Sequence, residues 1–68
     1  MSDPRELGTR LYDLRTRWGL SASQAAHRVG CSVSSIFNWE AGVEMPPARF
    51  LRRLAETYRV TVEELLGG

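Results

Sequence analysis

The sequence ASQAAHRVGCSVSSIFNWEA, residues 22–41, decides the fold of this chain. Its fifth residue, Ala26, falls where two helices would approach most closely, so a side chain larger than methyl would push them apart. Its ninth residue, Gly30, falls in the turn between the helices, where glycine tolerates the left-handed backbone that most residues resist. Further buried contacts are expected from Ala25, Val29, Cys31 and Ile36. The stretch therefore predicts two short helices joined by a tight turn.

The other helices are predicted from their capping signals. Four capping signals stand at Asp3-Pro4, Ser21, Ser32 and Thr61, and Pro46-Pro47 breaks the chain and begins the fourth helix. The first helix then ends near Gly19, the second at Gly30 and the third just before Gly42. Every apolar run repeats with a period of about 3.6 residues and none alternates, so the predicted fold class is all-α with five helices.

Two of these helices carry long apolar stripes. The first has Leu7, Leu11, Leu14 and Trp18, and the fourth has Phe50, Leu51, Leu54, Ala55 and Tyr58. Gly8 costs the first helix about 1 kcal/mol relative to Ala, which indicates that another element packs closely against it. Arg59 follows the fourth helix where a left-handed Gly or Asn usually stands. Either Arg59 takes that conformation or the helix ends differently.

The composition excludes several classes of protein. A chain of 68 residues forms one small domain, too short for a deep substrate cleft. It has no Ser/His/Asp set, no cluster of metal ligands and no glycine loop for phosphate, so we expect no enzyme, no metal and no cofactor. His27 is expected to be an exposed helix residue. The single cysteine, Cys31, cannot form an internal disulfide, and neither a membrane span nor an export signal is evident. These features predict a cytoplasmic protein.

The charge balance by itself indicates no partner. The net charge is only +1, so the distribution of charge has to carry the argument. All nine basic residues are arginine. Two explanations stay open: a compositional bias of the source genome, or the fit of the planar guanidinium fork to phosphate and guanine.

The spacing in residues 22–41 is that of a helix-turn-helix, whose second helix is shaped to enter the major groove of DNA. With LYDLRTRWGLS before it and RFLRRLAETYRVTVEELL after it, the chain resembles the phage repressor and Cro-like family of regulators, also called Xre-type. The resemblance implies a compact five-helix DNA-binding domain over residues 1–68. It also implies a sequence-specific transcriptional regulator that binds a palindromic double-stranded DNA operator as a homodimer. Among regulators, the resemblance favours a repressor.

The resemblance further implies an ion pair between the first helix and the residue that follows the recognition helix. Family members often pair an Arg with a Glu at these places, which here match Arg15 and Glu40. A buried pair would fix how the first helix lies against the recognition helix, whereas an exposed pair would contribute little. We favour the buried pair because both residues lie beside apolar stripe positions.

The face of the third helix that should meet DNA follows from its geometry. Ile36 and Trp39 must face the core. The opposite face of helix 33–39 then consists of Val33, Ser34, Phe37 and Asn38. By resemblance these residues meet base edges: Asn can bind adenine with two hydrogen bonds, and Val or Phe can contact a thymine methyl. Half-sites that contain A·T pairs are therefore expected.

Contacts to the DNA backbone are predicted from Ser21, Ser23, Arg10, Arg17, Arg28 and Arg49. The two serines stand at the start of the second helix, where free amides favour phosphate. A solvated surface role is equally open for Arg10, Arg17 and Arg28. The resemblance takes Arg49 to the minor groove, although Glu44 in the preceding loop would repel phosphate.

Two surfaces could bind protein instead. Val33 and Phe37 form an exposed apolar pair at i and i+4, and a protein-binding helix-turn-helix that uses this face is the alternative function. A dimer surface is expected at the C-terminal end, from Tyr58, Val60, Val62 and Leu66.

Overall fold

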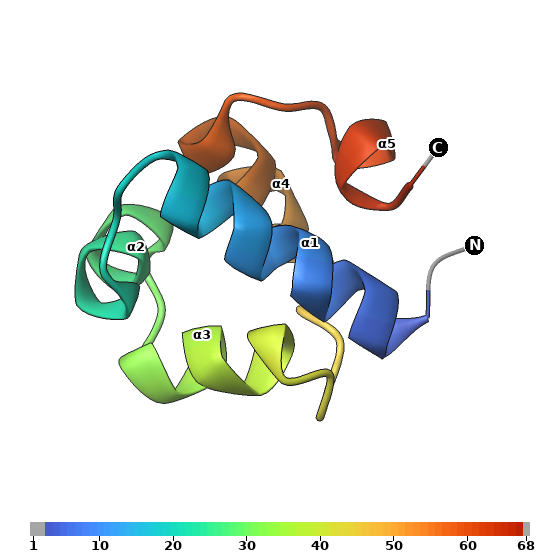
Figure 1. Cartoon of the computed structure of the whole chain (residues 1–68), viewed down its shortest axis with the longest axis horizontal. Coiled ribbons are helices and arrows are strands. Elements are labelled where there is room, and N and C mark those ends of the chain that lie inside the picture. The colour runs from blue at the N-terminus through green and yellow to red at the C-terminus, as the bar shows by residue number, and fades with distance from the viewer. Residues whose placement is uncertain (1–2, 68) are drawn as a thin grey trace.

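The computed structural model describes residues 3–67, so residues 1, 2 and 68 of the predicted domain lie outside the described residues. The described part of the chain contains five helices: α1 (Pro4–Arg17), α2 (Ala22–Val29), α3 (Val33–Glu40), α4 (Ala48–Tyr58) and α5 (Val62–Leu65). The predicted all-α class is confirmed. Figure 1 shows α1 across the middle of the molecule, with α3 on one side of it and α5 on the other. Within residues 3–67, no helix has both the length and the apolar character to cross a membrane.

The helices begin at the predicted caps. The Asp3 carboxylate accepts hydrogen bonds of 2.9 Å from the amides of Arg5 and Glu6. Complete capping boxes begin α2 at Ser21 and α5 at Thr61. Gly30 ends α2 with a φ of 85°, as the turn requires. These ends are predictable because each cap involves only near neighbours in the sequence.

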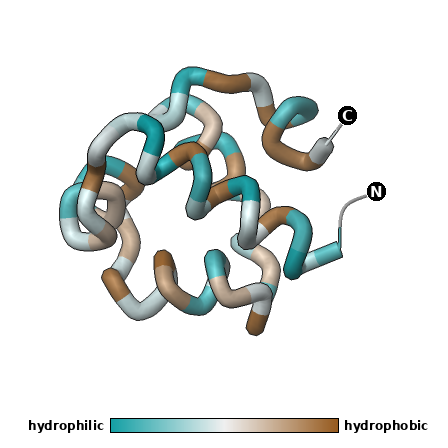
Figure 2. Tube along the Cα trace, in the orientation of Figure 1, coloured by the Kyte–Doolittle hydropathy of each residue, from teal (hydrophilic) through white to brown (hydrophobic). Residues whose placement is uncertain are grey.

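The core is built from one apolar face of each helix. Figure 2 shows that each helix carries both apolar and polar residues, as expected for amphipathic helices. The buried apolar side chains are Leu7, Leu11, Leu14, Ala22, Ala25, Ala26, Val29, Ile36, Trp39, Leu54, Ala55, Tyr58 and Leu65. Cys31, Phe50 and Leu51 are half-buried and pack against this core.

The prediction that Trp18 belongs to the buried stripe of α1 is wrong. Its side chain is 47% exposed, because α1 ends at Arg17 and Trp18 is the C-cap. The indole Nε1 donates a 2.9 Å hydrogen bond to the Tyr58 carbonyl, and this polar contact holds the ring at the edge of the core. The guanidinium carbon of Arg59 lies 5.6 Å from the centre of the indole ring. Trp18 therefore joins the end of α1 to the end of α4.

Two unusual backbone positions have clear explanations. Arg59 takes the left-handed conformation, with a φ of 58°, and ends α4. At Gly8, an added Cβ would lie 2.6 Å from the Trp39 carbonyl oxygen and closer still to that of Glu40. The expected close packing against Gly8 is thus provided by the C-terminal end of α3, which can lie directly on α1 only because Gly8 has no side chain.

We expect Gly8→Ala to destabilise the fold by about 1–3 kcal/mol, because overpacking against backbone atoms outweighs the gain in helix propensity. Urea unfolding would measure the loss. Thr9→Ala, at the neighbouring exposed position of α1, is the control and should change the free energy of unfolding by less than about 0.5 kcal/mol. A Gly8→Ala protein as stable as the natural one would contradict the account of the α1–α3 contact.

Candidate nucleic-acid interface

Helices α2 and α3 form the predicted helix-turn-helix. Ala25, Ala26 and Val29 of α2 are buried. The Ala26 carbonyl accepts hydrogen bonds from the amides of Gly30 at 2.8 Å and Cys31 at 3.0 Å, which close the turn. Ser32 then caps α3 through a hydrogen bond from the Ser35 amide. The turn is therefore closed by local bonds.

The two faces of α3 are separated as its spacing predicts. Ile36 and Trp39 are buried, and the Trp39 ring packs against that of Phe50 on α4 with 5.4 Å between ring centres. The residues of the opposite face, Val33, Ser34, Phe37 and Asn38, are all exposed. Phe37 is 54% exposed, so a large aromatic ring stands in the middle of this face.

The ion pair of Arg15 and Glu40 is present in its buried form. The Arg15 guanidinium donates two hydrogen bonds of 2.7 and 3.0 Å to the Glu40 carboxylate and a third of 3.0 Å to the Leu20 carbonyl. The two side chains are only 11% and 8% exposed. The hydrogen bonds to Glu40 raise the pKa of Arg15 above its usual value. The pair joins α1, the α1–α2 loop and the end of α3.

The predicted phosphate-contacting residues are not all on one side of the molecule. Ser21 and Ser23 are exposed at the start of α2, and Arg17 and Arg28 are exposed at the last turns of α1 and α2. Arg10 instead donates a 2.8 Å hydrogen bond to the Leu65 carbonyl of α5. Since α5 and α3 lie on different sides of α1 (Figure 1), the structure does not bring Arg10 beside the exposed face of α3.

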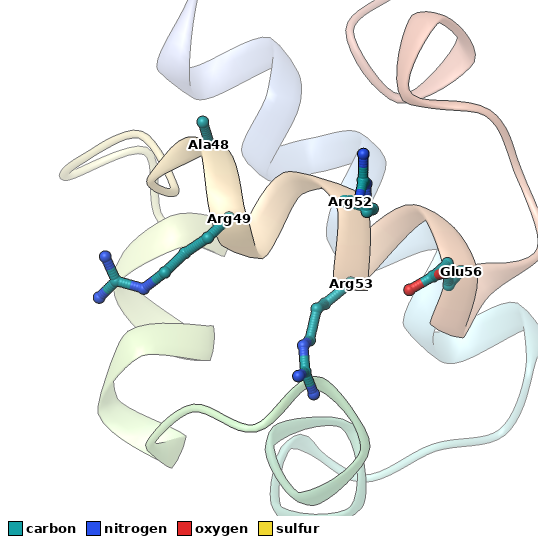
Figure 3. Close-up of a pocket in the computed structure, with 5 residues that line it drawn as sticks. All are labelled: Ala48, Arg49, Arg52, Arg53 and Glu56. Atoms are coloured by element: carbon teal, nitrogen blue, oxygen red, sulfur yellow. The ribbon is translucent and has the colours of Figure 1, made fainter.

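Arg49 belongs to a larger basic cluster on α4 that the sequence reasoning missed. Arg49, Arg52 and Arg53 border an open hollow of about 580 Å³ together with Ala48 and Glu56 (Figure 3). In Figure 3 the Arg49 side chain is directed toward α3, and its guanidinium carbon lies 4.8 Å from the centre of the Phe50 ring. The signal was available, because positions i, i+3 and i+4 from Arg49 share the helix face opposite the buried Leu54 and Ala55.

The predicted dimer surface loses one of its residues. Tyr58 is only 1% exposed and is one of the largest side chains of the core, so it is wrong to count it as surface. Its burial, and to a lesser degree the charge of Glu40, raises the pKa of Tyr58 to about 12. Burial also raises the pKa of the Cys31 thiol. Val60, Val62 and Leu66 keep at least part of their surface at this end of the molecule.

Comparisons with known proteins agree with this geometry. A family model described as a helix-turn-helix domain matches residues 6–66. The HTH-type transcriptional activator BcrR of Enterococcus faecalis is 33% identical over 63 residues, which are 93% of this chain but only 31% of that relative.

Two solved structures are similar in fold. The restriction-modification controller protein C.AhdI of Aeromonas hydrophila has a TM-score of 0.87 and 30% identity, over 93% of this chain and 96% of that one. A chain of the SinR protein/SinI protein complex has a TM-score of 0.82 and 28% identity, over 88% of this chain and 59% of that one.

Arg15→Met should lower the free energy of unfolding by about 3–5 kcal/mol, because it leaves the Glu40 carboxylate buried without a partner. Thermal or urea denaturation would measure this. The matched control is Arg17→Met, which removes an exposed arginine two positions further along α1. Equal effects of the two substitutions would show that the pair contributes nothing special.

The stability should fall at alkaline pH because of Tyr58. Its pKa is about 12 in the folded protein and near 10 when unfolded. Between these values the unfolded chain releases the phenolic proton while the folded chain keeps it, so the free energy of unfolding decreases as the pH rises. Tyr58→Phe should remove this part of the pH dependence, and Tyr12→Phe, at an exposed position of α1, should not. An unchanged alkaline profile in Tyr58→Phe would contradict the assignment.

Proposed function

The chain belongs to the helix-turn-helix domain family, and we propose that residues 1–68 are one DNA-binding domain of a sequence-specific transcriptional regulator. The observation that carries this proposal is the placement of α3. Its outer face is exposed, while its other face packs through Trp39 and its C-terminal end contacts Gly8 and the Arg15–Glu40 pair. The similar proteins BcrR and C.AhdI are named as a transcriptional activator and a restriction-modification controller, not as enzymes. The chain spans about a third of the length of BcrR.

In this proposal α3 enters the major groove. Asn38 offers a pair of hydrogen bonds to adenine, Ser34 can donate to a base on either strand, and Phe37 with Val33 can cover thymine methyl groups. Pre-organisation matters here because α3 has to keep its angle to the groove while several side chains meet adjacent base pairs.

Phosphate contacts would orient the domain on the duplex. Ser21 and Ser23 stand at the start of α2, where the helix dipole and amides attract an anion. Arg49 reaches from α4 toward α3 and is the arginine best placed to contact the same duplex (Figure 3). Arg17 and Arg28, in the last turns of α1 and α2, are proposed as further phosphate contacts at the edge of the DNA-binding face.

We also propose that two copies bind a palindromic operator as a repressor in the cytoplasm. A single α3 reads too few base pairs for useful specificity, and paired copies must place their recognition helices about one helical turn apart. Val60, Val62 and Leu66 supply exposed or partly exposed apolar surface at the C-terminal end for such a pairing.

A second candidate function is protein binding by the same face. In addition to Phe37, the exposed apolar residues include Val43 and Met45 in the loop that follows α3. The response to salt separates the two functions. A dimer that neutralises about 4–8 phosphates should lose affinity steeply as salt rises, whereas an apolar protein contact should not.

The decisive test is selection of bound duplexes from a random library. We expect enriched half-sites that contain A·T pairs, and Asn38→Ala should lose about 1–3 kcal/mol of discrimination at one base pair. Phe37→Ala should relax the preference for thymine. Glu63→Gln, on α5, is the control and should leave the selected sequence unchanged. No enrichment, or an affinity insensitive to salt, would favour the protein partner.

A further inference from the structure

Five arginines gather on one surface that includes α4. Arg49, Arg52 and Arg53 border the hollow on α4, and Arg28, Arg53 and Arg59 border a neighbouring hollow with Glu56 and Thr57. We call Arg28, Arg49, Arg52, Arg53 and Arg59 the arginine surface. It holds more than half of the nine arginines of the chain but only one of its eight carboxylates, Glu56. The rest of the molecule is therefore acidic on balance.

Contacts within the molecule do not neutralise this surface. None of its five arginines forms an ion pair within residues 3–67. Arg49 and Arg59 lie over the rings of Phe50 and Trp18, which leaves the charge of each guanidinium in place. Arg49 and Arg53 stand four residues apart on α4, a spacing at which like charges repel. Repulsion of this kind costs stability, so an anionic partner would relieve it.

The position of the surface separates most of it from a duplex seated on α3. Helix α4 begins beside α3, where Phe50 meets Trp39, and continues for about 16 Å toward α5. Arg49 stands at the near end and is directed toward α3, whereas Arg53 is directed toward the end of α2 (Figure 3). A Cβ placed on Gly30 would lie 3.4 Å from the Arg53 guanidinium, which confirms that location. A straight duplex in contact with α3 would meet only the near end.

The chain's own acidic residues do not supply a matching surface. Glu40 is bound to Arg15, and Asp3 and Glu64 serve as helix caps. Glu6 and Asp13 on α1 are interspersed with Arg10 and Thr9 around one shallow hollow. Glu44 lies in the loop after α3, and Glu63 adjoins Glu64 on α5. A second copy would therefore present single carboxylates or one pair to the arginine surface, not a longer run.

We propose that the part of the arginine surface beyond a duplex on α3, namely Arg52, Arg53 and Arg59, binds an acidic, Asp/Glu-rich segment of a partner protein. Planar guanidinium forks bind carboxylates with paired, charge-assisted hydrogen bonds. The spread of the arginines along α4 and across to α2 fits an extended segment better than a small anion. Glu56 and Thr57 among the arginines fit a peptide of varied side chains better than a uniformly charged phosphate backbone.

The test measures fluorescence anisotropy of a fluorescein-labelled Asp/Glu peptide of about ten residues, long enough when extended to span α4. Arg52→Gln/Arg53→Gln should weaken binding about fivefold or more at about 0.15 M salt. Arg5→Glu changes the net charge by the same amount at an exposed position of α1 and should change the affinity less than twofold. Equal losses in the two variants would overturn the proposal, since only net charge would then matter.

A second measurement adds the duplex selected with the natural protein. Peptide and duplex should bind at the same time, and Arg52→Gln/Arg53→Gln should keep the duplex affinity within about twofold. Displacement of the peptide by the duplex, or an equal loss of both affinities, would mean that these arginines contact DNA phosphates and would overturn the proposal. If no duplex binds at all, the proposed function fails while the peptide measurement still stands.

Discussion

The close approach of α1 and α3 governs what the exposed surface of this molecule can do. Helix α3 has only eight residues, and an isolated helix of that length is not stable in water. Its place depends on Gly8, which admits its C-terminal carbonyls to the surface of α1, and on the Arg15–Glu40 pair beside them. Moving the end of α3 away from α1 would break this pair and leave two buried charges without partners, so the pair holds α3 in place. These contacts set the orientation of α3 and therefore the directions in which the Phe37 and Asn38 side chains point.

Much of the fold was predictable because its determinants are local. The caps at Asp3, Ser21 and Thr61 use neighbours within three residues, so the residue pattern alone predicts the hydrogen bonds that form. Gly8 was informative for another reason. A glycine inside a helix lowers helix stability, so its presence indicated a close contact that a larger side chain would prevent.

What escaped prediction depends on distant parts of the chain. The position of the Trp18 ring depends on a hydrogen bond to the carbonyl of Tyr58, forty residues away. Tyr58 stands on the apolar stripe of α4, but only the packed structure shows that its whole side chain is buried and is absent from the C-terminal surface. Helical spacing is enough to group Arg52 and Arg53 with Arg49, but the location of Arg53 beside Gly30 at the end of α2 depends on how α4 packs against α2. The DNA contacts themselves stay predictions, since the fold displays the side chains of α3 without showing what they touch.

Charge in this protein is separated by location, and the separation is larger than the net value suggests. The molecule extends 21–28 Å, whereas screening in physiological salt acts over about 8 Å, so each face presents its own charge to a partner. A net charge of +1 therefore conceals a basic surface on α4 and α2 and an acidic balance elsewhere. The apolar ring of Phe37 stands outside the basic surface, in the middle of the exposed face of α3.

The two tryptophans give this small domain a pair of built-in optical reporters. Trp39 is 3% exposed between α3 and α4, whereas Trp18 is half-exposed where α1 meets the end of α4. An indole emits at longer wavelength in water because solvent dipoles relax around its excited state. The shorter-wavelength part of the emission thus follows the packing of α3 against α4, and the longer-wavelength part follows the contact of Trp18 with the end of α4. A Trp18→Phe protein would emit from Trp39 alone and report on α3, and a Trp39→Phe protein would emit from Trp18 alone and report on the end of α4.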